Sequence, residues 1–286
     1  MKSIKYFIQF LIISTLFLIF KILGVNFASY LSGKIISFIG PVFRSKDLIK
    51  SNILKALPNL SHSEVEKITK KMWNNYGRIL AEYIFIKDFR TSKLEKNIQI
   101  KGKEILEEIK KNNEPVIFVS GHFNNFELMA MQIEKSGINL AVIYRPLNNK
   151  FLNLIMERIR KKYICKNQIK KGISGTKQLL SFFKKKTSIA LMIDQRVSQG
   201  INSNFFENKA LTTTIPAQFV KKFNCKVVPI YIERKKDLSF QLTIYNPIKY
   251  TNEDSIDSIT LQLNSILEKM ILKNPDQWIW SHNRWK

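Results

Sequence analysis

Short apolar runs alternate with amphipathic stretches in the chain from about residue 97 onward. The strand-like runs cover residues 115–120, 138–144, 188–194 and 226–232, and a run with two-sided alternation follows at 239–245. Between and after them, apolar residues recur with helical spacing near 126–136, 149–163, 175–185, 214–224 and 255–272. Buried strands separated by amphipathic helices are typical of an α/β fold. The pattern therefore predicts a largely parallel central sheet flanked by helices.

A helical region precedes the sheet pattern, between residues 44 and 95. Apolar side chains recur three and four positions apart in it, at Val65, Ile68, Met72, Tyr76, Ile79, Leu80 and Tyr83. Ser61 followed by Glu64 has the spacing of a capping box, which predicts the start of a helix. No internal repeat, low-complexity linker or second boundary follows. We therefore expect a single domain over residues 44–286, with a helical first part.

The first 43 residues differ from the rest of the chain in their pattern of apolar and charged residues. An uncharged apolar run extends from Tyr6 to Phe20, and with Lys21, whose charge can snorkel, the segment approaches the roughly 20 residues needed to span a bilayer. A cleaved signal peptide is the main alternative, but no small-residue cleavage site closes the run and a lysine-rich body follows. We therefore expect residues 1–43 to be a retained membrane anchor, which either spans the bilayer or lies in its interface. Lysines flank both ends, so they do not decide its orientation.

Basic residues greatly exceed acidic ones. There are 47 Lys and Arg against 22 Asp and Glu, which gives a formal net charge of +25. Such a field attracts nucleic acid, acidic proteins, phosphorylated lipids or anionic membranes, although a coding bias toward lysine is an alternative cause. Between Arg145 and Lys186 there are 13 basic residues and one acid, Glu157. The basic amphipathic helix near 149–163 suits a membrane surface or an acidic carrier protein, or else it is an ordinary packed helix.

One of the three histidines occupies a position suited to catalysis. His122 directly follows an apolar strand pattern and Gly121, at the strand end where open α/β sheets place their ligands. Glu127 comes five residues later. On one continuous helix the two would diverge by about 140°, but a turn at His122 would let the carboxylate reach the imidazole. Such a pair fixes the tautomer and leaves the other nitrogen to take a proton from an alcohol. A structural hydrogen-bonding histidine is the alternative.

Other chemistries find less support in the sequence. The chain has no GxSxG elbow, and its ten glycines form no phosphate-binding loop. Cys165 and Cys225 stand alone, which disfavours a disulfide framework and a zinc site. We therefore expect no metal and no cofactor, and direct attack of a substrate hydroxyl on an activated acyl group.

Four blocks carry a resemblance to a known family. They read GHFNNFE, YRPLNN, DQR…FFEN…TTTIPA and DQWIWSHNRWK, in order along nearly the whole chain. The chain resembles the late acyltransferases of lipid A biosynthesis, within the glycerolipid and lysophospholipid acyltransferase superfamily. The resemblance implies an acyl carrier protein as donor and an anionic glycolipid acceptor, a Kdo-bearing lipid A precursor. It implies an acyltransferase domain at the cytoplasmic face of the inner membrane, with His122 and Glu127 as the catalytic dyad.

The same blocks suggest substrate contacts. Arg145 falls on the arginine of the YRP block and is a candidate for binding phosphate or the donor, or else a solvated loop residue. Asn125, Asp194 and Arg196 are further candidate substrate-binding residues, although the position of Asp194 at a strand end favours a structural role over a catalytic one. The sequence departs from the family pattern at three places: Asn124 with Phe126, Arg196, and Glu207. These departures affect the expected acceptor and acyl chain length more than the expected reaction.

Rival functions remain to be separated from this one. A membrane-tethered nucleic-acid binder would use the positive charge. The sequence shows no recognisable nucleic-acid-binding module, so we expect no nucleic-acid partner. A non-catalytic membrane scaffold would leave the block around His122 unexplained. Within enzymes, the alternative is an acyltransferase acting on a lysophospholipid or a mannosyl lipid.

Overall fold

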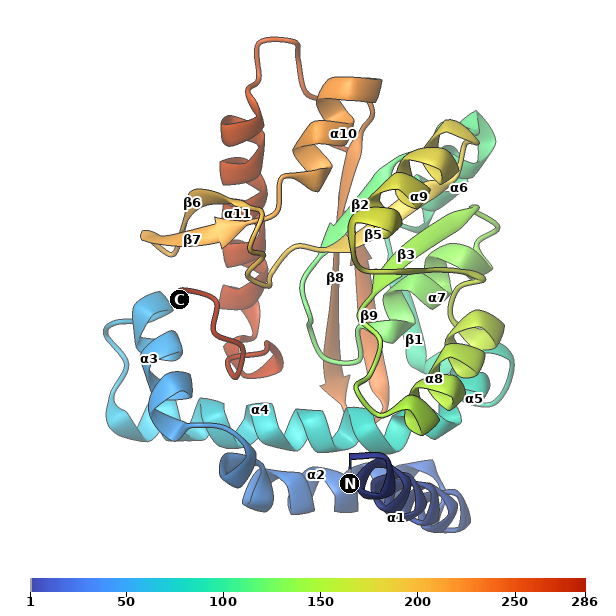
Figure 1. Ribbon diagram of the computed structural model, residues 1–286, viewed down its shortest axis with the longest axis vertical. Helices are drawn as coiled ribbons and strands as arrows, with labels where there is room; N and C mark the ends of the chain where they lie inside the picture. The colour runs from blue at the N-terminus through green and yellow to red at the C-terminus, as the bar shows by residue number, and fades with distance from the viewer. Residues whose placement is uncertain (1) are drawn as a thin grey trace.

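The computed structural model describes residues 2–286 and contains a seven-stranded sheet and a two-stranded ribbon (Figure 1). The strands are β1 (Ile98–Lys101), β2 (Ile117–Ser120), β3 (Leu140–Tyr144), β4 (Asn167–Lys170), β5 (Ser188–Met192), β6 (Ile201–Phe205), β7 (Asn208–Thr212), β8 (Val227–Lys236) and β9 (Ser239–Ile244). The sheet order is β1-β9-β8-β2-β5-β3-β4. Neighbours are parallel except for β8 and β9, which are antiparallel. The expected largely parallel α/β sheet is therefore confirmed.

Helices surround this sheet and extend beyond it at the N-terminal end of the chain. The α-helices are α1 (Lys2–Leu23), α2 (Val25–Phe43), α3 (Lys46–Ala56), α4 (His62–Glu82), α5 (Ile86–Thr91), α6 (Lys103–Asn112), α7 (Glu127–Lys135), α8 (Lys150–Tyr163), α9 (Ile173–Lys184), α10 (Ile215–Phe223) and α11 (Ile256–Lys273). Three short 3-10 helices are η1 (Tyr83–Phe85), η2 (Glu95–Asn97) and η3 (Pro275–Gln277). The capping box expected at Ser61 and Glu64 opens α4.

The strands that the hydrophobic pattern predicts are the ones in the middle of the sheet. All four residues of β2 are buried, because the strand lies between β8 and β5 and is covered on both faces. Five other elements, β1, α6, β4, β6 and β7, were not expected. Both β1 and β4 are four-residue edge strands that carry polar side chains, and β6 and β7 form a polar ribbon away from the main sheet. Short polar strands lack a hydrophobic signature.

Helix α2 packs closely along α4 at the lower end of the molecule (Figure 1). The Ser32 hydroxyl donates a 2.6 Å hydrogen bond to the carbonyl of Gly77. A Cβ at Gly77 would lie 2.2 Å from the backbone carbonyl oxygen of Ser32, and a Cβ at Gly40 would lie 2.4 Å from the Trp73 ring. These glycines therefore allow the two helix backbones to approach one another closely.

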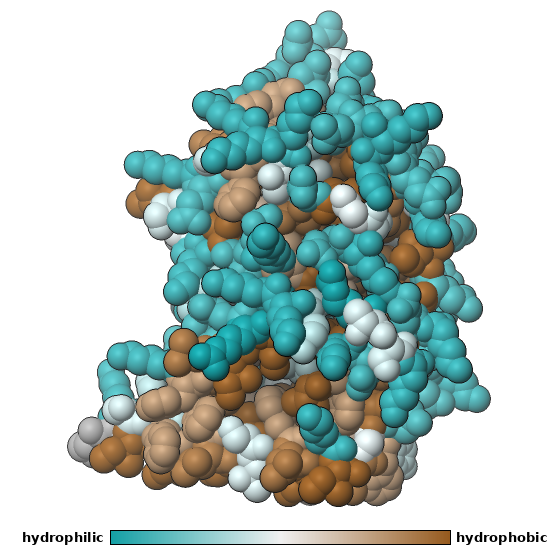
Figure 2. Space-filling model, turned by 90° about the vertical axis from the view of Figure 1, so that its right-hand side faces the viewer, coloured by the Kyte–Doolittle hydropathy of each residue, from teal (hydrophilic) through white to brown (hydrophobic). Residues whose placement is uncertain are grey.

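Helix α1 lies against the body through contacts near its start. Asn149 donates a 2.7 Å hydrogen bond to the carbonyl of Tyr6, and the rings of Phe7 and Phe151 meet edge to face with centroids 5.5 Å apart. Within residues 2–286, α1 is the one helix long and apolar enough to cross a membrane by length and composition. Figure 2 shows apolar surface gathered at the lower end of the molecule, where α1 and α2 lie, beneath a largely hydrophilic body.

Candidate active site

His122 and Asp194 meet because their strands are parallel neighbours in register. Ser120 at the end of β2 pairs with Met192 at the end of β5, and each of the two site residues comes two positions later. The peptide hydrogen bond from Ile193 N to Ser120 O, 2.9 Å, carries the pairing one residue beyond the strands. The carboxyl ends of adjacent parallel strands meet at one edge of the sheet, where open α/β folds hold their ligands. The fold thus brings an imidazole and a carboxylate together there.

The carboxylate of Asp194 holds His122 at two points. Its Oδ1 lies 2.8 Å from His122 Nδ1, and its Oδ2 accepts a 2.7 Å hydrogen bond from the His122 backbone N–H. The indole N–H of Trp278 donates a further hydrogen bond of 2.9 Å to Oδ2. The Asp194 side chain is fully buried, whereas a fifth of the His122 side chain is exposed. This arrangement fixes the ring and leaves Nε2 free of any partner within the described residues.

The electrostatics of the pair follow from this geometry. Burial alone lowers the pKa of His122, but the charge of Asp194 and its hydrogen bond outweigh burial and raise that pKa above its ordinary value. Burial alone raises the pKa of Asp194, but the charge of His122 and the hydrogen bonds from His122 and Trp278 lower it. Asp194 is therefore ionised when His122 takes up a proton, as a carboxylate that stabilises an imidazolium must be.

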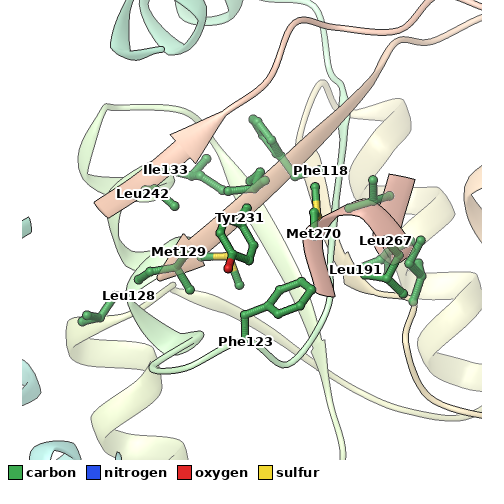
Figure 3. Packing of buried hydrophobic residues seen from close by; sticks show 14 of the residues in the cluster. Phe118, Phe123, Leu128, Met129, Ile133, Leu191, Tyr231, Leu242, Leu267 and Met270 are labelled. Carbon is green, nitrogen blue, oxygen red and sulfur yellow. The ribbon is translucent and has the colours of Figure 1, made fainter. Parts of the chain in front are cut away.

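The residues around His122 anchor its loop in the core. Phe123 is fully buried and packs edge to face on Tyr231, with ring centroids 5.0 Å apart (Figure 3). A Cβ at Gly121 would lie 3.0 Å from Leu267 and from Phe123, so a larger residue would press on this packing. The His122 ring itself meets Phe126 edge to face at 4.9 Å. The loop thus turns Phe123 into the core and leaves part of the preceding His122 side chain exposed.

The expected contact between Glu127 and His122 is wrong. Glu127 begins α7, and its Oε1 accepts hydrogen bonds from Nε, at 2.9 Å, and Nη2 of Arg160 on α8. It makes no hydrogen bond to His122, which is held instead by the residue interpreted from the sequence as structural, Asp194. The reason lies in the topology. Strand β5 places the Asp194 carboxylate beside His122 Nδ1, whereas Glu127 comes later, at the start of α7. Glu127 still acts on His122 through space, since its negative charge contributes to the raised pKa.

Asn125 belongs to a buried polar network rather than to the exposed part of the site. Its side chain is 2% exposed and donates a 3.0 Å hydrogen bond to Glu82 at the end of α4. Glu82 also accepts from Ser29 on α2, at 2.7 Å, and forms a paired contact with Arg234 on β8, at 2.8 and 2.9 Å. Three elements and the loop after His122 therefore share a single fully buried carboxylate.

The two candidate substrate-binding arginines differ in setting. Arg145 is exposed in the loop after β3, and its side chain has no hydrogen bond or ion pair to other described residues. Arg196 is half-buried two residues beyond Asp194, and its buried Nε has no protein partner among residues 2–286. Substrate binding by either residue stays a prediction. Within residues 2–286, no cluster of His, Cys, Asp and Glu could hold a metal ion.

Several site residues were missed from the sequence. Arg160 lies in the helix predicted to be basic and amphipathic, and Trp278 in the closing DQWIWSHNRWK block, but neither contact was predicted. The alternating apolar pattern gives no sign of either contact, because both join elements far apart in the chain. In chemical terms, the site offers an oriented imidazole with a free nitrogen, backed by a buried carboxylate. Such a site can remove a proton from a hydroxyl.

Comparison with known proteins identifies the family of this chain. The family of bacterial lipid A biosynthesis acyltransferases matches residues 1–286. Over 246 residues the chain is 23% identical to a lipid A biosynthesis palmitoleoyltransferase of Escherichia coli, covering 85% of this chain and 79% of that protein. It is also 23% identical to a lauroyltransferase of that organism over 251 residues, covering 85% and 79%. Identity to the corresponding myristoyltransferase is 21% over 251 residues, covering 87% and 76%.

One solved structure is also similar. The 1-acyl-sn-glycerophosphate acyltransferase of Thermotoga maritima is 13% identical, with a TM-score of 0.44 over 89% of this chain and 98% of that one. The fold and the His122–Asp194 pair define an α/β protein with a candidate proton-transfer site at the carboxyl ends of its strands. The match to the family over the whole chain shows more, and this protein belongs to the bacterial lipid A biosynthesis acyltransferases. It is an enzyme of acyl transfer in lipid A biosynthesis, with a lipid A-type acceptor.

Proposed function

We propose that the protein transfers a fatty acyl group from acyl carrier protein to a hydroxyl of a Kdo-bearing lipid A precursor, with His122 as general base. The observation that carries this proposal is the oriented imidazole, with Nδ1 on Asp194 and Nε2 without a protein partner. The strong positive charge supports an acidic donor protein and a phosphorylated acceptor. The family supports the lipid A acceptor class.

The mechanism assigns different roles to the two carboxylates. His122 Nε2 takes the proton of the acceptor hydroxyl as the oxygen attacks the acyl carbonyl, and Asp194 stabilises the imidazolium that forms. His122 then returns the proton to the leaving thiolate. Glu127 is a positioning residue, because its ion pair with Arg160 joins the start of α7 to α8. No nucleophilic residue of the protein takes part in these steps.

We place the protein at the inner membrane with residues 44–286, the acyltransferase domain, facing the cytoplasm. Residues 1–43 form the anchor, and the apolar surface at the lower end of the molecule supports this placement. A lipid acceptor never leaves the bilayer, so an anchored enzyme keeps its site within reach of it. The acyl carrier protein, a soluble partner, then approaches from the cytoplasmic side.

The test is transfer by the purified full-length protein in detergent. Acyl carrier protein loaded with a fatty acid and a Kdo-bearing lipid A precursor are the substrates, and mass spectrometry detects one added acyl group. His122→Ala should lower the rate about 100-fold or more, as loss of a positioned base does. Acylation of a lysophospholipid in place of the precursor would show that the acceptor is wrong. Undiminished turnover by His122→Ala would show that the base is wrong.

A further inference from the structure

The C-terminal tail, residues 274–286, contacts both halves of the histidine–carboxylate pair. Pro275 follows the end of α11, where a proline cannot continue the helix, and the tail passes through η3 between α11 and α4 (Figure 1). The side chain of Asn274 fixes the start of the tail on β8. It donates hydrogen bonds to the Tyr231 hydroxyl, at 3.0 Å, and to Glu233 Oε2, at 2.7 Å. The residues that follow η3 then reach the site.

Gln277 holds the loop that carries His122. Its backbone carbonyl accepts a 2.9 Å hydrogen bond from the Asn124 N–H, and its Oε1 accepts another of 2.9 Å from the Asn124 side chain. The Gln277 side chain also bonds to the backbone N–H and carbonyl of Arg234 on β8, at 2.8 and 3.0 Å. Asn75 on α4 accepts a further 2.8 Å bond from Asn124. The turn after His122 is therefore held by the tail, β8 and α4.

Trp278, the next residue, holds the other half of the pair. Its ring is 2% exposed, and its indole N–H donates a 2.9 Å hydrogen bond to Asp194 Oδ2. The other two contacts of this carboxylate, with the backbone N–H and the ring of His122, lie within the pair itself. Arg196 is two residues beyond Asp194, but its buried Nε has no partner among residues 2–286. In that part of the chain, Trp278 is thus the one group that ties the carboxylate to a third element.

We propose that Trp278 is a positioning residue for proton transfer, which fixes the Asp194 carboxylate relative to the loop that its neighbour Gln277 holds. The inference rests on the proposed role of His122 as general base. The carboxylate stabilises the imidazolium only while its oxygens keep their places beside the ring and the backbone of His122. Because Trp278 is buried, it does not touch substrate. Its effect therefore falls on the chemical step and not on substrate binding.

The indole hydrogen bond also moderates the charge that acts on His122. Burial raises the pKa of Asp194, whereas the charge and hydrogen bonds of His122 and the bond from Trp278 lower it. Without the indole N–H, the carboxylate attracts the proton of the imidazolium more strongly, so the pKa of His122 should rise. The other ionisable groups that face the pair stay unchanged, and they are Tyr76 on α4, Glu127 on α7, Arg160 on α8, and His282 and Arg284 on the tail.

The test compares Trp278→Phe with a second variant that carries benzothienylalanine at position 278. In that side chain a sulfur replaces the N–H while the ring keeps its size, so the hydrogen bond is lost without loss of packing. The full-length protein in detergent is assayed with acyl carrier protein thioester and the lipid A precursor. Both variants should lower kcat by about 10-fold, as loss of a hydrogen bond to a charged group does, with KM nearly unchanged. NMR titration of the histidine rings without substrate should show a raised pKa for His122 in both.

Trp280→Phe is the matched control. This indole is also buried and meets the Trp278 ring edge to face, with centroids 4.7 Å apart. Its N–H, however, donates to the carbonyl of Pro275 at 2.6 Å and not to the pair. The control should keep the wild-type pKa of His122 and most of the wild-type kcat.

An unchanged pKa of His122 in the benzothienylalanine variant would overturn the proposal. Equal effects of Trp278→Phe and Trp280→Phe on kcat and on that pKa would overturn it as well, because packing of the tail would then explain both. In a wild-type protein that transfers acyl groups, these outcomes remove only the role of Trp278. A wild-type protein that transfers no acyl group would overturn the proposed function itself.

Discussion

At the scale of single residues, the two carboxylates near His122 make separate contacts. Asp194 touches the imidazole at 2.8 Å, and Glu127 holds Arg160. The sequence spacing alone favoured Glu127, because it lies close to His122 along the chain. The strand register shows why the distant residue has the direct contact, since β2 and β5 end side by side. The pH dependence of the rate distinguishes the two roles.

The first prediction concerns that pH dependence. His122 acts as a base only when neutral, so kcat/KM should rise with pH through an apparent pKa above the ordinary 6.5, the direction in which Asp194 moves it. Asp194→Asn removes the charge and leaves burial dominant. The rise should then move to lower pH while the maximum rate falls. Rates measured from pH 5 to 9 in wild-type and variant check this, and an unmoved pH profile in Asp194→Asn would contradict it.

The second prediction concerns the buried carboxylate of Glu82. Glu82 is fully buried and pairs with Arg234, whose side chain is 9% exposed. Replacing Glu82 by Ala leaves an uncompensated buried guanidinium, which should lower the free energy of unfolding by roughly 3 to 5 kcal/mol. Denaturant unfolding in detergent measures the change. Glu107→Ala is the control, because its ion pair with Lys103 is exposed and should contribute nothing measurable.

At the scale of elements, helix α8 combines a structural and a surface role. Its Arg160 reaches inward to Glu127, whereas Lys161 and Lys162 are exposed. The helix has no fully buried residue, so its basic side is available to a partner. An ordinary packed helix with a solvated face, the alternative weighed from the sequence, would bury its apolar positions more completely.

The third prediction follows from this exposed side. Lys161→Glu with Lys162→Glu should raise the KM for acyl carrier protein and leave kcat nearly unchanged, because docking of an acidic partner is electrostatic. The KM of the wild-type should rise with salt, and the variant should respond less. Lys110→Glu with Lys111→Glu on α6 makes the same charge change at an exposed site elsewhere. An equal response in both double variants would place donor docking elsewhere or make it non-specific.

The sequence predicted the central elements better than the peripheral ones. Strands β2, β3, β5 and β8 are recognisable as short apolar runs, and β9 and the helices between the strands by apolar periodicity. The edge strands β1 and β4 and the ribbon β6–β7 are short and polar, so periodicity does not reveal them. Strand β1 depends on pairing with β9, which lies far along the chain, and β4 on pairing with β3, whereas β6 and β7 pair with each other as a hairpin.

The site shows the same division between local and distant information. His122 was singled out from the sequence by its place after a strand, which is a local signal, and its catalytic role stays a prediction. Its partner could not be found by spacing, because Asp194 lies 72 positions away and the pairing needs the strand order. Asn125 was expected to bind substrate, yet its amide is used by Glu82, an α4 residue with no local sign of a role. Tertiary hydrogen bonds of this kind leave no trace in periodicity.

At the scale of the whole molecule, apolar and basic surfaces lie in different places. Exposed apolar side chains gather on α1 and α2, forming what we call the apolar base: Ile4, Phe7, Ile8, Leu11, Ile12, Leu18, Ile19, Ile22, Leu23, Phe27, Tyr30, Ile35, Phe38, Val42 and Phe43. Because both helices contribute, the base is wider than a single spanning helix. It also adjoins α8, since Asn149 and Phe151 contact the first half of α1. A bilayer that accepts the whole base would therefore take α1 along its surface.

The last prediction separates a helix that spans from a surface that lies in the interface. Phe38 and Val42 on α2 are 85% and 84% exposed, so replacing both by Glu should not disturb the fold. If the apolar base enters the bilayer, each buried methylene contributes about 0.8 kcal/mol to binding, and two charges there should weaken co-sedimentation with vesicles strongly. Activity on detergent-dispersed acceptor should persist.

Leu261→Glu with Leu272→Glu on α11, away from the base, makes the same change and should leave sedimentation unaltered. If the α2 variant sediments as wild-type while removal of residues 2–23 releases the protein, α1 alone holds it and spans the bilayer.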